Sequence, residues 1–182
     1  QVNALPHGFD ARALWDCWLV WRRALVGPKV AALLSLPHAR EKLKPEALWE
    51  YDNAQALSYM AFQRASQKRT GFYNHLRKLL ETHDVLALPV AQVWPFPLQE
   101  RWPQHIGDRA MDTYHRWMEC TIYATLAGLP AISLPAGFHP TKPWPMGIQL
   151  IGKPQGDLAL LQLAHAYEMA NLAMLAQTPP GV

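Results

Sequence analysis

The spacing of apolar residues divides the chain into a helical first part and a second part that mixes strands and helices. Asp10, a residue type favoured at helix N-caps, precedes apolar residues at three- and four-residue spacing, which predicts a helix. These residues are Leu14, Cys17, Trp18, Trp21 and Leu25. Gly27 and Pro28 are predicted to end this helix, because both residue types disfavour a helix interior.

The rest of the first part is also predicted to be helical. A second apolar segment, 30–36, stops at Pro37, and Pro45 is well placed in the first turn of the next helix. From there to Thr82 the pattern is helical and is expected to form two segments. Gly71 is a candidate interruption, because an interior glycine costs about 1 kcal/mol relative to alanine.

Short apolar runs bounded by glycine and proline characterise the second part. Residues 84–89 are predicted to form a buried strand, and the proline-rich segment 90–103 is predicted to be a loop. A helix over 109–127 is expected to end at Gly128 in a left-handed C-cap. Strands at 131–136 and 146–151 with an irregular connection, a helix at 158–171 and a frayed tail at 178–182 complete the prediction.

Composition narrows the classes of protein. The 182 residues are 50% hydrophobic and 17% charged, which favours one well-buried domain of α/β class, with helices packed on a few short mixed strands. The basic residues are scattered, so no nucleic-acid surface is predicted, and no apolar run reaches the roughly 18 residues needed to span a bilayer. Cys17 and Cys120 lack CxxC spacing and are expected to be buried thiols in the cytoplasm, with a disulfide as the alternative.

Four short motifs follow one another from residue 84 onward, after a helical stretch that contains Arg64 and Arg69. The pattern D-x-L-x-x-P falls on Asp84, Leu86 and Pro89, and G-x-P-A-x-S-x-P-x-G-F falls on Gly128, Pro130, Ala131, Ser133, Pro135, Gly137 and Phe138. The pattern P-x-G-x-Q-L-x-G falls on Pro145, Gly147, Gln149, Leu150 and Gly152, and L-L-x-x-A-x-x-x-E falls on Leu160, Leu161, Ala164 and Glu168. In this order and with these gaps, they closely resemble the C-terminal end of the amidase signature family, hydrolases that cleave amide bonds with a Ser-cisSer-Lys triad.

The resemblance implies a partial amidase-signature fold in a single domain, 1–182, in which 1–42 is a helical lead-in, 43–175 is family-like and 176–182 is a tail. It also implies that the glycine- and serine-rich triad segment is absent from these residues. The chain is therefore expected to be the C-terminal structural and substrate-channel portion of an amidase, inactive alone. Its expected partners are a small-molecule amide and either further copies of itself or the missing N-terminal half.

No catalytic residue, metal site or cofactor is predicted within the chain itself. None of the serines lies in a glycine-rich loop, and Ser133 lies in an apolar run that favours a buried, backbone-bonded hydroxyl over a nucleophile. No two histidines have the spacing of a zinc-binding helix, and His75, His83, His105, His115 and His165 are expected to be surface or capping groups. Asp112 and Glu119 are expected on one helix without a partner carboxylate.

Substrate contacts are expected from the loop after the 84–89 strand, where Trp94, Phe96 and Trp102 could form apolar walls; packing without ligand contact is the equal alternative. Gln149 is a polar residue within an apolar strand. It is expected either to line the substrate pocket or, as buried amides more often do, to bond neighbouring backbone.

Two other functions stay open. The chain could be a non-catalytic interaction module or a subunit that pairs with a separate triad-bearing chain, because a sheet without its neighbours leaves open edges. The helix with Trp15, Trp18, Trp21 and the Arg22-Arg23 pair is also compatible with a membrane interface, although its one-sided apolar face favours core packing or a dimer contact.

Overall fold

A computed structural model describes residues 2, 4 and 8–177 of the chain. The residues pack into two compact units, Gln1–Asn74 and His75–Val182. Helix α4, Tyr59–Leu79, carries the chain from the first unit into the second. The predicted frayed tail at 178–182 lies outside the described residues, and the single domain with a family-like region from residue 43 stays a prediction.

Helix α1, Ala11–Leu34, forms the centre of the first unit. The Asp10 carboxylate accepts a hydrogen bond of 3.0 Å from the Ala13 amide, which confirms the predicted N-cap. The prediction that Gly27 and Pro28 end the helix is wrong. Gly27 is buried where a Cβ would overlap that of Ala54, so the lack of a side chain allows close packing that offsets the cost of the proline.

Two short helices and the start of α4 complete the first unit: α2, Ala39–Lys42, and α3, Pro45–Ala54. Pro45 occupies the first turn of α3, as predicted, and the stretch from Pro45 onward forms two helical segments, α3 and α4. The interruption expected at Gly71 is not observed. Gly71 is exposed and a Cβ there would have no neighbour within 4 Å, so this residue is a tolerated weak point of a continuous helix.

Aromatic rings fill the interior of the first unit. Trp15 is fully buried and stacks on Trp18 with centroids 4.9 Å apart, and Trp21 lies 4.7 Å from Phe62. The α1 tryptophans therefore pack within the unit, in agreement with the core-packing interpretation. None of the helices described is long and apolar enough to cross a membrane.

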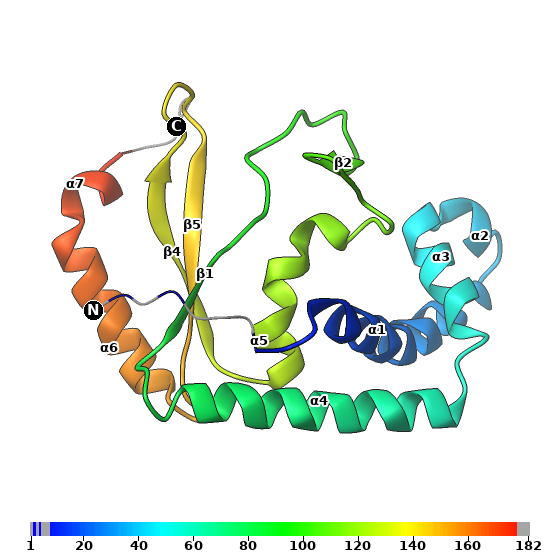
Figure 1. The fold of residues 1–182 in the computed structure, drawn as a ribbon. Helices are drawn as coiled ribbons and strands as arrows, with labels where there is room; N and C mark the ends of the chain where they lie inside the picture. The colour runs from blue at the N-terminus through cyan, green and yellow to red at the C-terminus, as the bar shows by residue number, and fades with distance from the viewer. Residues whose placement is uncertain (1, 3, 5–7, 178–182) are drawn as a thin grey trace. The chain divides into compact units, whose positions relative to one another are not determined.

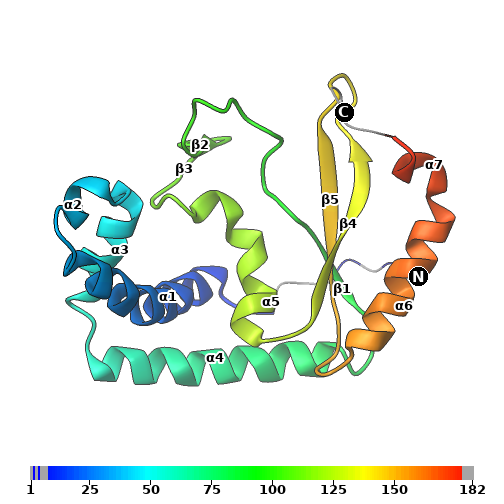
Figure 2. The same cartoon turned by 180° about the vertical axis from the view of Figure 1, so that it is seen from behind.

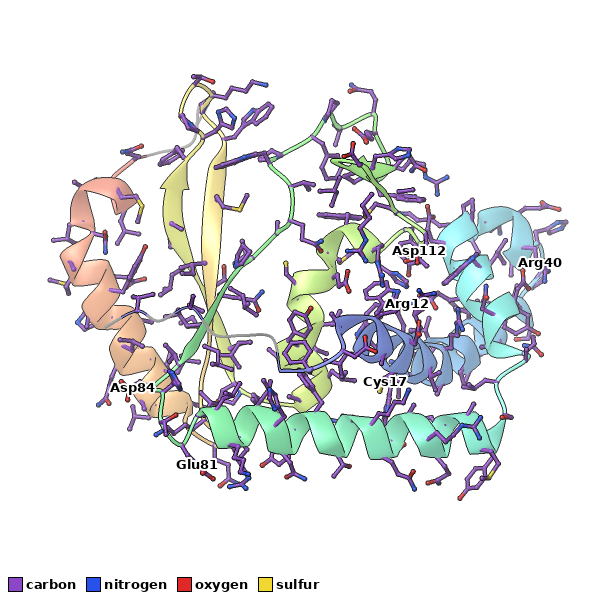
Figure 3. All side chains as sticks on the ribbon, in the orientation of Figure 1. Arg12, Cys17, Arg40, Glu81, Asp84 and Asp112 are labelled. Carbon is purple, nitrogen blue, oxygen red and sulfur yellow. The ribbon has the colours of Figure 1, made fainter. Side chains whose placement is uncertain are left out.

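The buried thiol of Cys17 donates a hydrogen bond of 3.1 Å to the carbonyl of Ala65 on α4 (Figure 3). Cys17 and Cys120 are both free and buried, so the prediction of two thiols is confirmed.

A three-stranded antiparallel sheet with the order β1-β5-β4 forms the framework of the second unit (Figure 1). The strands are β1, Leu86–Pro89, β4, Ala131–Phe138, and β5, Pro145–Ile151, which confirms the three predicted strands. The predicted burial of the 84–89 strand is wrong, because β1 residues are half-buried or exposed. Strands β4 and β5 form a wide hairpin with a bulge between Pro135 and Gly137. Because strand pairing extends to Phe138 and Pro145, the connection between them is shorter than predicted, and the predicted irregularity lies in the bulge.

Helix α6, Asp157–Ala170, covers one face of the sheet, and α7, Leu172–Leu175, follows it (Figure 2). The predicted helix at 158–171 is confirmed. An apolar core joins helix and sheet; its fully buried members are Leu134, Leu150, Leu160 and Ala164. These elements give the mixed α/β class that the sequence predicted.

The helix predicted over 109–127 begins later than expected. The chain first forms a small hairpin from β2, His105–Ile106, and β3, Arg109–Ala110, followed by the 3₁₀ helix η1, Arg116–Thr121, and α5, Ile122–Ala127. Gly107 at the hairpin turn has a φ of 55°, which glycine adopts without strain. The predicted left-handed cap at Gly128 is confirmed, with φ 70° and a 2.8 Å bond from its amide to the Ala124 carbonyl.

Candidate functional site

A cavity of about 780 Å³ lies in the second unit, between the loop that follows β1 and the β4–β5 hairpin. Segment 90–96 forms one wall, and residues of β4, β5 and α7 form the others. Its aromatic and larger aliphatic lining residues are Val90, Trp94, Phe96, Trp117, Leu134, Phe138, Met146, Met174 and Leu175.

Two of the predicted substrate-contacting residues, Trp94 and Phe96, line this cavity. The Phe96 ring meets Trp117 edge-on at 5.3 Å, and the Trp94 ring meets His139 edge-on at 4.9 Å. Trp102 is half-buried and lies outside the cavity lining. Sequence reasoning missed the residues that η1, the hairpin and α7 contribute, because their approach to the loop depends on tertiary structure.

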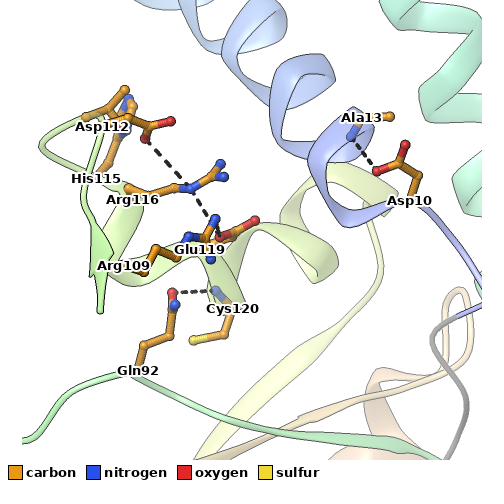
Figure 4. A network of polar contacts seen from close by, with 10 residues as sticks. Asp10, Ala13, Gln92, Arg109, Asp112, His115, Arg116, Glu119 and Cys120 are labelled. Atoms are coloured by element: carbon orange, nitrogen blue, oxygen red, sulfur yellow. Dashed lines mark hydrogen bonds and ion pairs between the residues drawn. The ribbon is translucent and has the colours of Figure 1, made fainter. Parts of the chain in front are cut away.

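Gln149 is buried on β5 and joins two distant segments. Its amide nitrogen donates hydrogen bonds of 2.9 Å to the Pro89 carbonyl and 3.1 Å to the Cys120 carbonyl. The Gln92 side-chain oxygen accepts a 3.3 Å bond from the Cys120 amide (Figure 4). The backbone amide and the backbone carbonyl of Cys120 are therefore both hydrogen-bonded. These bonds have the backbone-pinning geometry of the second interpretation of Gln149, and they hold the start of the loop against η1. That a substrate contacts Trp94, Phe96, Trp102 and Gln149 stays a prediction.

Gly147 has a steric reason to be glycine. A Cβ at this position would lie 3.1 Å from the Leu134 carbonyl oxygen and 2.8 Å from a methyl carbon of Val90. The Val90 amide donates a 3.2 Å bond to the Gly147 carbonyl. The missing side chain therefore lets the first residue of the loop pack closely on β5, which positions the cavity wall.

Ser133 is exposed and contributes to the wall of the cavity, so the expectation that it is buried is wrong. Ser133 is opposite Gln149 in the sheet, whereas its neighbour Leu134 belongs to the core beneath α6. Because alternate residues of a strand face opposite sides, the apolar neighbours of Ser133 point away from it. None of the cavity-lining residues described is a His, Lys, Asp or Glu that could accept the Ser133 proton.

The other three serines bond the backbone of their own helices. Ser35 and Ser66 donate to the carbonyls of residues 32 and 62, and Ser58 accepts from the amide of residue 61. These bonds are typical of serine at helix ends and interiors. None of these three serines therefore has the surroundings of an activated nucleophile.

A network of ion pairs lies on η1 and the residues before it (Figure 4). Glu119 is buried and lies 3.3 Å from Arg116 and 3.2 Å from Arg109, and Arg116 also lies 3.7 Å from Asp112. The expectation that Asp112 and Glu119 share a helix is wrong, because Asp112 precedes η1. Both carboxylates nevertheless lie near Arg116, because the turn before η1 brings Asp112 to it.

The sequence places His115 among the surface or capping groups. The structure makes it the N-cap residue of η1 without a side-chain cap bond and buries it fully, with Nδ1 2.7 Å from the Thr113 hydroxyl. Burial raises the pKa of the Cys120 thiol and of the Tyr123 phenol, and the Glu119 carboxylate raises both further. Both groups are therefore neutral near pH 7. Within residues 8–177, no cluster of three or more His, Cys, Asp and Glu side chains has an arrangement suited to a metal ion.

Comparison with known proteins relates this architecture to amide hydrolases. Residues 26–161 match the family model Amidase. A glutamyl-tRNA(Gln) amidotransferase subunit of Dehalococcoides mccartyi is 35% identical over 120 residues, which are 65% of this chain and 22% of that protein. Its counterpart in Thermodesulfovibrio yellowstonii is 38% identical over 110 residues, 60% of this chain and 21% of that protein. The chain thus spans about a fifth of the length of these curated relatives.

Solved structures share the fold. A bacterial aryl acylamidase of the amidase signature enzymes aligns with a TM-score of 0.75 at 21% identity, covering 93% of this chain and 36% of that one. A 6-aminohexanoate cyclic dimer hydrolase aligns with a TM-score of 0.77 at 19% identity, covering 98% and 39%. Because the family model matches well over half of its residues, the chain belongs to the amidase family.

Proposed function

We propose that this chain is the C-terminal portion of an amidase signature hydrolase and forms one wall of its substrate channel. The order of the motifs from Asp84 to Glu168 supports the C-terminal placement, and the family match over residues 26–161 supports the class of enzyme. The small share of each relative that the chain covers is compatible with a larger catalytic assembly.

The observation that carries the proposal is the cavity beside the loop after β1. Trp94 and Phe96 form its aromatic wall, and the exposed Ser133 on β4 also lines it. Gln149 supports this wall by bonding the Pro89 carbonyl at the start of the loop. Trp102 lies on the same loop but outside the cavity lining. In this arrangement the chain shapes the channel and the chemistry comes from elsewhere.

In the whole enzyme, the triad serine would attack the amide carbonyl, the amine would leave, and water would hydrolyse the acyl enzyme. The chain alone is proposed to be inert, because the triad segment is absent from its sequence and no base lines the cavity among the residues described. Activity of this chain above background that Ser133→Ala abolishes would overturn the proposal.

A chimera tests whether this chain can form part of a working amidase. The 120-residue stretch of the D. mccartyi relative that aligns with this chain would be replaced by the corresponding residues of this chain. We expect the chimera to release ammonia from a simple carboxamide, and a Ser→Ala change at the nucleophile of the relative's own segment to abolish that release. A chimera that unfolds cooperatively but hydrolyses no amide would contradict the proposal.

A second candidate function is that of a non-catalytic subunit that pairs with a separate triad-bearing chain. The outer side of α6 favours it, because Leu158, Leu161 and Met169 are exposed there, with Leu158 at 71%. Strand β4 is also an edge strand of the sheet described. Sedimentation velocity distinguishes the candidates: self-association or a stable complex is expected for the non-catalytic role, and a clean monomer with no dye-accessible apolar surface counts against it.

A further inference from the structure

The cavity walls carry no charged side chain in the part of the chain that the structure describes. Apart from Ser133 and Gln177, the lining side chains are apolar or aromatic. Lys142 lies in the turn between β4 and β5, with its ammonium group 3.9 Å from the centre of the Trp144 ring. Neither Lys142 nor Trp144 is a lining residue. The charges of the η1 network likewise belong to residues outside the lining.

The lining also has a defined shape. Edge-to-face contacts pair Phe96 with Trp117 and Trp94 with His139, so one wall is built from rings held by other rings. Loop and sheet are held together by the Val90–Gly147 bond and by Gln149. At about 780 Å³, the cavity lies within the range of roughly 300–1,000 Å³ that small-molecule sites occupy.

We propose that this cavity binds the uncharged apolar or aromatic portion of the amide substrate and rejects an amide that carries a carboxylate on that portion. The inference rests on the proposed function, since it assumes that the cavity belongs to the substrate channel. Its physical basis is the cost of desolvating a carboxylate where no cation is present and, among the lining residues described, only the Ser133 hydroxyl and the Gln177 amide, apart from the tryptophan rings, could replace water. A neutral ring loses no such hydration and gains apolar contact area.

Ser133 is the position at which this selectivity can be tested. It is the polar side chain that β4 presents to the cavity, and it is exposed, so a substitution there changes the character of the wall without disturbing the core. Ala131 offers a matched control: it lies two residues earlier on the same strand face, is also exposed, and is not a lining residue.

The test measures binding to this chain by isothermal titration calorimetry with two probes that differ in one carboxylate, acetanilide and 4-acetamidobenzoate. We expect acetanilide to bind about tenfold or more tightly than its charged analogue. Ser133→Asp is expected to weaken acetanilide binding about tenfold, whereas Ala131→Asp leaves it unchanged. Ser133→Lys is expected to reverse the preference in favour of 4-acetamidobenzoate by placing a cation in the wall.

Three outcomes would overturn the inference: equal or tighter binding of the charged probe to the unmodified chain, no saturable binding of either probe, or equal losses in Ser133→Asp and Ala131→Asp. Cooperative unfolding of each variant at the normal denaturant concentration shows that it is folded. The binding test is independent of the triad. Acetanilide binding with an inactive chimera would therefore reject the proposed function alone, and an active chimera that prefers charged amides would reject this inference alone.

Discussion

The two units of the chain each bury a glutamate, and they neutralise it in different ways. In the first unit, Glu50 of α3 is 1% exposed and pairs across the helix interface with Arg22 of α1. In the second unit, Glu119 of η1 is 6% exposed and shares two arginines, Arg109 and Arg116. Glu50 thus pairs with an arginine of another helix, whereas Glu119 pairs with two arginines that lie within ten residues of it in the sequence. The two units should respond differently to the loss of one arginine.

The largest effect is expected from Arg22→Ala. Removing this side chain takes the Arg22 guanidinium away from the deeply buried Glu50 carboxylate, which costs about 3 kcal/mol of unfolding free energy. It also removes the guanidinium that lies 5.3 Å from the centre of the Trp18 ring. Urea unfolding followed by circular dichroism measures the loss.

Arg40→Ala is the matched control for Arg22→Ala. Arg40 and Asp52 also form a pair in the first unit, at 3.4 Å, but both side chains are exposed, so a change within about 0.5 kcal/mol is expected. If Arg22→Ala unfolds at the same urea concentration as Arg40→Ala, the Glu50 ion pair contributes nothing to stability.

Gln149→Leu is expected to have the next largest effect. The substitution keeps the side chain close in size but leaves the Pro89 and Cys120 carbonyls without their buried donor, which costs about 2 kcal/mol. The matched control is Gln104→Leu, because Gln104 makes one bond to the Trp102 carbonyl at an exposed site. Equal losses in the two variants would mean that the Gln149 bonds do not hold the loop to η1.

Arg109→Ala sharpens the comparison between the two glutamates. Arg109 is 50% exposed and Glu119 keeps Arg116, so a loss of no more than about 1 kcal/mol is expected. The loss should also shrink at high salt, because an exposed pair is screened. A loss as large as that of Arg22→Ala, unaffected by salt, would show that Glu119 depends on Arg109 despite the second arginine.

The sequence predicted the elements whose signals are local. Asp10 as a cap, Gly128 as a left-handed stop and the apolar strand ending at Pro89 all depend on neighbouring residues, and all are observed. Pro28 failed as a helix end because the fit of Gly27 against Ala54 is a tertiary effect. The Gly107 turn could have been recognised from the sequence, since glycine followed by aspartate between short runs is a hairpin signal.

The cavity was only partly predictable for the same reason. Trp94 and Phe96 lie in the loop that the family motif singles out, whereas Trp117 and Met174 reach the cavity from helices whose placement no local pattern indicates. Ser133 was misjudged because an apolar run indicates burial of the strand and not of each face. The partners of Gln149 lie 60 and 29 residues away, so the sequence suggested a buried amide but not the segments it joins.

The smallest effect distinguishes the units by their thiols. Burial raises the pKa of both Cys17 and Cys120 above the ordinary value of 9.0. Lys68 and Arg69 oppose the rise at Cys17, whereas Glu119 adds to it at Cys120, and a backbone hydrogen bond opposes the rise at each thiol. Below pH 9 the folded and unfolded chains both hold these protons. Above it the unfolded thiols ionise first, so stability falls as the pH rises through the folded-state pKa values.

Between pH 8.5 and 10.5, the urea midpoint should therefore fall in the unmodified chain, and the fall should be smaller in Cys120→Ala than in Cys17→Ala. Ionisation of Tyr123, whose pKa is also raised, adds to the fall in all three proteins and does not change their order. The comparison uses the change in midpoint with pH, because each alanine substitution also removes apolar contacts at every pH. An equal or steeper fall in Cys120→Ala than in Cys17→Ala would mean that the thiol of Cys17, despite the basic residues near it, is at least as hard to ionise as the one beside Glu119.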